Sequence, residues 1–184
     1  MVKVIGLAGR IGSGKSTVAW EIARQLEGHD YSAEVLSFAT PLKSMLETML
    51  TAAGMTRKDA EIWVHDHDYR EQPCPVLSGR TPRYALQTLG TQWGRDILSK
   101  TVWADLGRQR AAKSQCDVVI FDDVRFLTEV DVLGQDKVFL VHRGTPGDAE
   151  HESELLPFAR DVWAIDNNGR PAATARKIMK IAGV

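Results

Sequence analysis

Apolar residues along the chain form short continuous runs and stripes of helical spacing, and the two kinds of segment alternate. Five runs of strand type cover residues 2–8, 33–38, 118–121, 137–141 and 162–165. Helical stripes, with apolar positions three and four residues apart, lie at 18–26, 42–50, 102–112 and 175–182. This alternation predicts an α/β fold in three layers, in which five parallel strands are joined by right-handed crossovers and flanked by helices.

The segment between the second and third strands departs from this regular pattern. Residues 54–79 carry scattered charges and two prolines, which predicts a loop-rich insertion. Thr81 and Pro82 favour the start of a helix, with a hydroxyl at the N-cap and proline at the first helical position. The leucines and methionines of the stripe at 42–50 are predicted to pack in the core.

A glycine-rich segment at residues 9–16, Gly-Arg-Ile-Gly-Ser-Gly-Lys-Ser, joins the first strand to the first helix. It fits the phosphate-loop pattern G-x-x-x-x-G-K-[ST] at its fixed positions: Gly9, Gly14, Lys15 and Ser16. Glycines let backbone N–H groups approach phosphate oxygens, and a helix N-terminus adds partial positive charge. Lys15 is expected to neutralise the β- and γ-phosphates, and Ser16 to bind Mg²⁺. The sequence therefore predicts a nucleoside triphosphate site.

The composition limits the class of protein and its expected partners but points to no further functional site. The 184 residues carry a formal net charge of −1, and 43% are hydrophobic, as in ordinary soluble globular proteins. No polymeric nucleic acid or membrane is expected as a partner, since there is neither an overall basic charge nor a spanning or signal-like segment. Cys74 and Cys116 predict two free thiols in a cytoplasmic protein, in the host cytoplasm if the gene is carried by a phage. A homodimer is left open.

Acidic residues occur in two places that invite a metal. Asp122 and Asp123 follow the buried run at 118–121, at the strand end where ligands of open α/β sheets bind. Asp123 is the first candidate for holding a metal through water, with Asp122 a close rival. The stretch 65–68, His-Asp-His-Asp, has no further ligand cluster at metal spacing, so a solvated loop is expected there.

Groups suited to a second substrate gather after the irregular segment. Arg83 and Gln87 share one helix face, Arg95 follows, and Tyr84 and Trp93 supply aromatic rings. Arginine recognises phosphate through a rigid fork of donors, and rings and amides recognise bases. The combination favours a nucleotide acceptor, against the alternative of surface ion pairs and core aromatic residues.

Residues 81–95, Thr-Pro-Arg-Tyr-Ala-Leu-Gln-Thr-Leu-Gly-Thr-Gln-Trp-Gly-Arg, resemble the signature of bacteriophage-type deoxynucleoside monophosphate kinases, a family of P-loop nucleotide kinases. Four shorter segments resemble the family in the same order, at 37–43, 123–126, 151–154 and 167–169. The chain departs from the family at Thr128-Glu129, where Asn-Glu is common, and at Ser16, where many members have Asp. Residues 54–72 match least, which leaves the base, and deoxyribose against ribose, open.

The resemblance implies MgATP-dependent phosphorylation of a dNMP by in-line transfer. It implies one P-loop kinase domain over 1–184, with an acceptor-binding insertion at about 41–113 and a lid-like segment at about 143–161. The ATP site would contain Gly9, Arg10, Gly12, Ser13, Gly14, Lys15, Ser16, Thr17 and Asn167. The dNMP site would contain Phe38, Lys43, Arg83, Gln87, Thr91, Trp93, Arg95 and Arg125. The metal site would contain Ser16, Asp122 and Asp123; the catalytic residues would be Lys15, Asp123, Arg125 and Arg143; and the lid would contain Arg143, His151, Ser153, Glu154 and Arg160.

Two alternatives stay open at this point. The opening of the chain is also similar to dephospho-coenzyme A kinases, a resemblance that fades after residue 25 and does not extend to the segment 81–95. A nucleotide-dependent switch without enzymatic activity is the other alternative. The sequence lacks a guanine-reading Asn-Lys-x-Asp segment, which counts against a GTPase.

Overall fold

The computed structural model describes residues 2–144 and 162–184, which divide into two compact units. The first unit combines the described residues up to Phe38 with those from Ala104 onward, and the second unit consists of residues 39–103. The insertion predicted at 41–113 therefore overlaps nearly all of the second unit and includes one helix that belongs mostly to the first.

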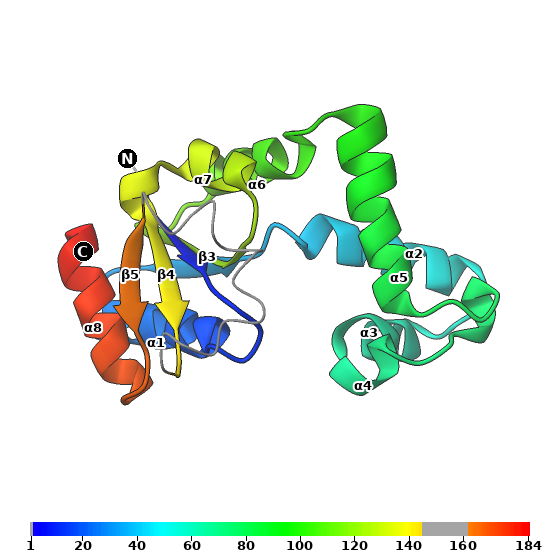
Figure 1. Cartoon of the computed structure of the whole chain (residues 1–184), viewed down its shortest axis with the longest axis horizontal. Helices are drawn as coiled ribbons and strands as arrows, with labels where there is room; N and C mark the ends of the chain where they lie inside the picture. Colours follow the sequence, from blue (N-terminus) through cyan, green and yellow to red (C-terminus); the bar gives the residue numbers. More distant parts are fainter. Residues whose placement is uncertain (1, 145–161) are drawn as a thin grey trace. The chain divides into compact units, whose positions relative to one another are not determined.

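A single parallel sheet forms the centre of the first unit. Its strands are β1 (Lys3–Ala8), β2 (Ala33–Leu36), β3 (Val118–Val124), β4 (Val138–His142) and β5 (Trp163–Asp166). The strand order is β2-β3-β1-β4-β5, and every neighbouring pair is parallel. Since β3 is an inner strand, its continuous apolar run is buried on both faces. The predicted α/β class with five parallel strands is confirmed (Figure 1).

Helices cover both faces of this sheet, so the unit has three layers. The helices are α1 (Lys15–Glu27), α6 (Val102–Lys113), α7 (Leu127–Leu133) and α8 (Pro171–Ala182), with a short 3₁₀ turn, η3 (Gln135–Lys137), after α7. Ile22 of α1 and Ile178 of α8 pack with Ile120 of β3 on one face. Val130 of α7 packs with Phe121 of β3 on the other. Adjacent β3 residues thus enter opposite layers, as the pleat requires.

The second unit is built from helices. They are α2 (Thr40–Ala52), α3 (Arg57–His65), α4 (His67–Arg70), the 3₁₀ turn η1 (Pro75–Leu77), α5 (Pro82–Thr88) and the π-helix η2 (Leu89–Leu98). Its core consists of Leu46 and Leu50 from α2, Ala60 and Val64 from α3, and Cys74. As predicted, Thr81 caps α5, its hydroxyl accepting a hydrogen bond from the Tyr84 N–H over 3.1 Å.

Two predictions for the second unit are wrong. Residues 54–79 are not loop-rich, because α3 and α4 occupy much of this stretch, and Thr56 caps α3 by accepting from the Asp59 N–H. The stripe at 42–50 does not pack wholly in the core, because Met45 and Met49 are 39% and 48% exposed. The buried residues of α2, Leu46 and Leu50, pack with residues of α3 and α5.

Among the described residues, none of the helices combines the length and the apolar character that crossing a membrane requires. Both cysteines are free: Cys74 is buried and Cys116 is half-buried, which agrees with the sequence-based expectation for the thiols.

Candidate active site

The phosphate loop connects β1 to α1 and is shaped by three glycines. Gly9, Gly12 and Gly14 have φ angles of 150°, 79° and 88°, a region that residues with side chains rarely adopt. A Cβ on Gly9 would stand 2.3 Å from the Val141 carbonyl oxygen, and one on Gly14 would stand 2.6 Å from Asn167 Nδ2. Glycine is therefore required at both fixed positions of the motif.

Lys15 extends back over this loop. Its ammonium group donates a hydrogen bond to the Arg10 carbonyl oxygen over 2.6 Å. Burial, followed by the positive charge of Arg125, lowers the pKa of Lys15 from 10.5 to about 8, while Asp122 and Asp123 act in the opposite direction. A lysine that has lost hydration beside another cation favours an anionic ligand, because the anion would restore the stability of the charged form.

The N-terminus of α1 adds to this preference for an anion. Its N-cap is Gly14, in the left-handed conformation, and its first turn contains no acidic residue. Ser16 and Thr17 are exposed in that turn. The first N–H groups of a helix have no partner within the helix and carry partial positive charge, so this end of α1 suits a phosphate group.

Asp123 is tied to the end of β2. Its Oδ2 accepts from the Ser37 hydroxyl over 2.6 Å, and its Oδ1 accepts from the Phe38 N–H over 2.8 Å. Arg110 Nη1 donates to the carbonyl oxygen of the same Ser37 over 3.1 Å. Both Asp123 oxygens thus have partners in the protein, and Asp122 acts more strongly than Asp123 on the charge of Lys15.

The donor set near the loop fits Mg²⁺. The Ser16 hydroxyl is exposed and the Asp122 carboxylate is half-buried, and Mg²⁺ prefers oxygen ligands. Within residues 2–144 and 162–184, no cluster of three or more His, Cys, Asp or Glu side chains could enclose a metal.

Arg125 lies in a loop that a buried glutamate fixes. Glu129 is only 3% exposed, and its Oε2 accepts from the N–H groups of Arg125 over 2.7 Å and Phe126 over 3.1 Å. The carboxylate therefore sets the backbone from which the Arg125 side chain extends. Sequence reasoning missed both α7 and this role, although an acid in the first turn of a helix is a capping signal.

Asn167 and Arg143 meet the phosphate loop from the ends of β5 and β4. Asn167 is fully buried, and its Nδ2 donates to the Ser13 carbonyl oxygen over 2.8 Å. Arg143 Nε donates to the Asn167 carbonyl oxygen over 3.2 Å. Arg143 Nη2 lies 3.7 Å from the position that a Cβ on Gly14 would take. The guanidinium group therefore lies beside the N-cap of α1.

Around the loop, the first unit brings together many of the residues expected from sequence. They are Gly9, Arg10, Gly12, Ser13, Gly14, Lys15, Ser16, Thr17, Asp122, Asp123, Arg125, Arg143 and Asn167. Phe38 also belongs to this unit, but its ring stacks on Phe121 with 4.3 Å between centroids and is 3% exposed. Of the expected lid residues, only Arg143 is described; His151, Ser153, Glu154 and Arg160 lie outside the described residues.

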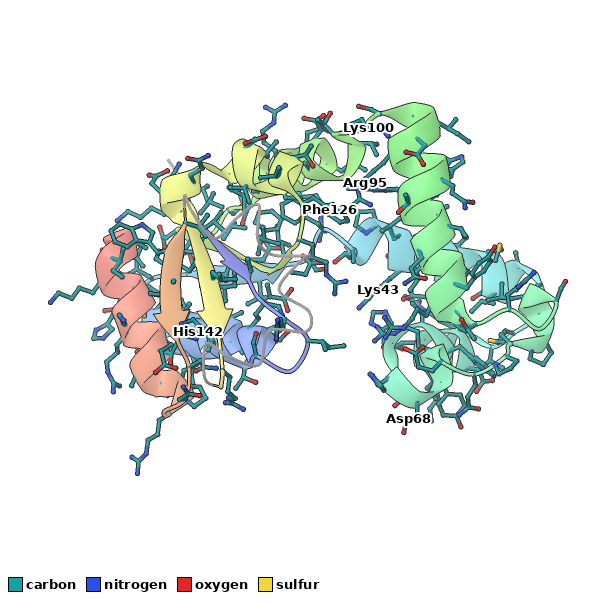
Figure 2. All side chains as sticks on the ribbon, viewed as in Figure 1. Lys43, Asp68, Arg95, Lys100, Phe126 and His142 are labelled. Atoms are coloured by element: carbon teal, nitrogen blue, oxygen red, sulfur yellow. The ribbon has the colours of Figure 1, made fainter. Side chains whose placement is uncertain are left out.

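The remaining residues expected at the acceptor lie in the second unit: Lys43 on α2, Arg83 and Gln87 on α5, and Thr91, Trp93 and Arg95 on η2. Figure 2 labels Lys43 and Arg95, which come from two different helices of this unit. Arg83 donates from Nε to Glu71 Oε1. Thr91 and Gln87 are exposed.

The π-helix is organised by two glycines and a tryptophan. The Gly90 carbonyl oxygen accepts from Trp103 Nε1 over 2.8 Å and from Arg95 Nη1 over 3.2 Å. A Cβ on Gly94 would stand 2.4 Å from the Trp103 ring, so glycine is needed there for packing. Trp93 packs against Trp103 with 6.2 Å between ring centroids and stays 39% exposed. Such helices are frequent at functional sites.

The stretch 65–68 spans the junction between two helices: His65 ends α3, Asp66 is extended, and His67 begins α4. His65 Nε2 and Glu47 Oε1 lie 2.6 Å apart, and Asp66 caps α4 by accepting from the Asp68 and Tyr69 N–H groups. His65 and Glu47 line a hollow of about 730 Å³ between α2 and α3, together with Ser44, Thr48, Thr51, Ala52, Arg57 and Glu61.

Comparisons with known proteins give one partial relative and a fold. No protein-family model matches the chain. A deoxynucleoside-5'-monophosphate kinase of Escherichia phage T5 is 38% identical over 53 residues, which are 29% of this chain and 21% of that protein. The match thus spans about a fifth of that relative's length.

Two solved structures are similar over nearly the whole chain. TT1252 from Thermus thermophilus has a TM-score of 0.51 at 17% identity, covering 99% of this chain and 97% of its own. A shikimate kinase from Acinetobacter baumannii in complex with shikimate has a TM-score of 0.48 at 14% identity, covering 98% and 93%. The first likeness supports the three-layer α/β fold alone.

Proposed function

We propose that this chain is a MgATP-dependent deoxynucleoside monophosphate kinase, which transfers the γ-phosphoryl group of ATP to a dNMP. The observation that carries the proposal is the desolvated Lys15 in a glycine-shaped loop, with Arg125 and two carboxylates within its electrostatic reach. The 53-residue match to the phage T5 dNMP kinase supports the choice of acceptor.

On the donor side, the loop backbone and the N-terminus of α1 would hold the β- and γ-phosphates, with Lys15 neutralising them. Arg143 would add charge at the same place, because its guanidinium group lies beside Gly14. Mg²⁺, when bound, neutralises charge on the phosphoryl oxygens and orients them. Ser16 and Asp122 are the residues we propose for the metal, since Ser16 follows Lys15 in the first turn of α1 and Asp122 raises the pKa of Lys15 more strongly than Asp123 does.

On the acceptor side, Arg83 and Arg95 would bind the monophosphate, with Lys43 as a further cation. Gln87, Thr91 and the exposed part of Trp93 would contact the nucleoside. Arginine suits this task because its planar fork matches phosphate oxygens in two hydrogen bonds.

The reaction would need no general base. A monophosphate oxygen is already an anionic nucleophile, so catalysis would consist of positioning the two phosphates in line and neutralising their charge. Arg125 would stabilise charge on the transferring group, and Glu129 would hold the backbone of Arg125 for this purpose. No side chain in the proposed mechanism has to remove a proton.

Product analysis tests the proposal. The protein is incubated with MgATP and, separately, with each of the four dNMPs, the matching ribonucleotides, dephospho-CoA or no acceptor, and the products are separated by anion exchange. We expect a dNDP and an equal amount of ADP with at least one dNMP, and a loss of about a hundredfold or more in kcat for Lys15→Met. Phosphorylated dephospho-CoA would favour a dephospho-CoA kinase instead. If no acceptor in the panel caused ADP release, the result would contradict a small-molecule kinase of either kind.

A further inference from the structure

Asn167 stands at the start of the turn between β5 and α8 and is fully buried. A side chain with no exposed surface cannot reach a nucleotide in this form of the protein. Its polar atoms instead have partners within the fold, as buried amides require. The sequence predicts that Asn167 contacts ATP. Its four hydrogen bonds within the fold instead indicate a structural role beside the phosphate loop.

The side-chain amide is fixed at both ends. Nδ2 donates to the Ser13 carbonyl oxygen over 2.8 Å, and Oδ1 accepts from the Thr174 hydroxyl over 2.8 Å. Thr174 lies on α8 and is itself 5% exposed. Because one amide atom can only donate and the other can only accept, the two contacts together fix the orientation of the amide group.

The hydrogen bond to Ser13 orients a donor of the phosphate loop. The Ser13 carbonyl and the Gly14 N–H belong to one planar trans peptide, in which C=O and N–H point in opposite directions. Holding the carbonyl toward Asn167 therefore turns the Gly14 N–H away from it. Gly14 is the N-cap of α1, where backbone N–H groups bind phosphate.

The backbone of Asn167 holds a second element of the same site. Its N–H donates to the His142 carbonyl oxygen over 2.8 Å, and its carbonyl oxygen accepts from Arg143 Nε over 3.2 Å. A guanidinium group anchored through Nε keeps its two terminal nitrogens for other ligands. Arg143 Nη2 lies near Gly14, so one buried residue contacts both the loop and the arginine beside it.

We propose that Asn167 is a positioning residue that, braced by Thr174, fixes the Ser13–Gly14 peptide and Arg143 for phosphate binding, without contacting ATP. This inference rests on the proposed function only in taking the loop to bind ATP, and it does not depend on the acceptor. The inference predicts that a substitution of Thr174 on α8, which is buried away from any ligand, changes how the phosphate loop binds ATP.

Thr174 offers a matched pair of variants. Thr174→Val keeps the shape of the side chain but removes the hydroxyl that donates to Asn167 Oδ1, whereas Thr174→Ser keeps the hydroxyl. We expect Thr174→Val to raise the Kd for ATP about five- to a hundredfold, the range for a buried polar group left unpaired. Thr174→Ser should stay within about twofold of the wild type. The KM for the acceptor should not change with either variant.

Amide hydrogen exchange in the nucleotide-free protein supplies the second readout. In Thr174→Val the amides of residues 10–16 should exchange faster than in the wild type, and in Thr174→Ser they should not. A lower unfolding temperature in Thr174→Val, with unchanged ATP affinity and unchanged exchange at 10–16, would show a purely structural role and overturn the inference. If the wild type bound ATP but phosphorylated no dNMP, the proposed function would fail while both readouts still decided the role of Asn167.

Discussion

The lowered pKa of Lys15 predicts that ATP binding takes up protons. In the empty protein, burial chiefly, with Arg125 adding to it, brings the pKa of Lys15 to about 8. The phosphates of a bound triphosphate would stabilise the ammonium form and return the pKa toward or above its ordinary value of 10.5. Binding near pH 8 should then take up about half a proton, and binding near pH 9 about nine tenths of one. Near pH 7 the uptake falls to about a tenth.

Calorimetry measures this uptake directly. ATP is titrated into the protein at constant excess Mg²⁺ in two buffers of equal pH but different ionisation enthalpy, and the difference in observed heat gives the number of protons. The apparent affinity should also weaken above about pH 8, approaching tenfold for each pH unit. The same pKa shift also affects folding in the absence of ligand. Between about pH 8 and 10.5, Lys15 holds more protons in the unfolded chain than in the folded protein, so its contribution to the free energy of unfolding rises with pH in that window.

Two variants define the outcome that would refute this reasoning. Lys15→Met should abolish the uptake, whereas Lys100→Met, which removes an exposed lysine paired with Asp96, should leave it unchanged. Equal heats in the two buffers for the wild type near pH 9, or the same uptake in Lys15→Met, would show that Lys15 does not change protonation on binding.

Three further predictions concern the metal, the acceptor and the core. Asp122→Asn should raise the Mg²⁺ concentration needed for half-maximal rate and weaken Mn²⁺ binding measured by EPR, more than Asp123→Asn does; equal effects would return Asp123 to the metal site. Arg83→Ala should raise the KM for dNMP about ten- to a hundredfold with little change in the KM for ATP, and equal changes in steady-state kinetics would place Arg83 elsewhere. Gly107→Ala should lower the free energy of unfolding in urea by about 1–3 kcal/mol, because its Cβ would stand 2.3 Å from the Phe38 ring; unchanged stability would mean that this packing relaxes freely.

The sequence predicts the first unit well because its elements carry strong local patterns. The run at 118–121 is apolar at every position, which only an inner parallel strand explains easily, and β3 lies between β1 and β2. The phosphate loop is equally visible, since its glycines are needed for positive φ and close approach, which Gly9 and Gly14 show. In the strand and in the phosphate loop, the residues that form the local sequence pattern are the same ones that the tertiary structure requires, so the pattern alone predicts the element.

The second unit is harder to predict because its signals are weak or arise only in three dimensions. Helix α3 has nine residues and fully buries just Ala60 and Val64, so its apolar stripe is too short to detect from periodicity. The π-helix depends on the close packing of the Trp103 ring against Gly94. These residues are nine apart in sequence, and no local sequence pattern predicts their contact. The need for glycine at position 94 becomes clear only when the position of Trp103 in the fold is known.

Within the site, sequence identifies which residues gather but not how they divide the work. Asp122 and Asp123 are adjacent and chemically identical, but Asp123 accepts hydrogen bonds from Ser37 and Phe38, and Asp122 acts more strongly on the pKa of Lys15. Asn167 follows a strand as a ligand-binding amide would, yet it is fully buried. Burial and hydrogen-bond partners, which depend on the whole fold, decide such roles.

The most direct test of the central claim is to follow the transferred phosphoryl group by ³¹P NMR. With MgATP and an accepted dNMP, the account predicts a new dNDP β-phosphate signal, coupled to the α-phosphate, that grows in step with ADP. It predicts the absence of this signal with Lys15→Met over the same time. Growth of inorganic phosphate alone, or a dNDP signal as fast with Lys15→Met as with the wild type, would contradict phosphoryl transfer by this loop.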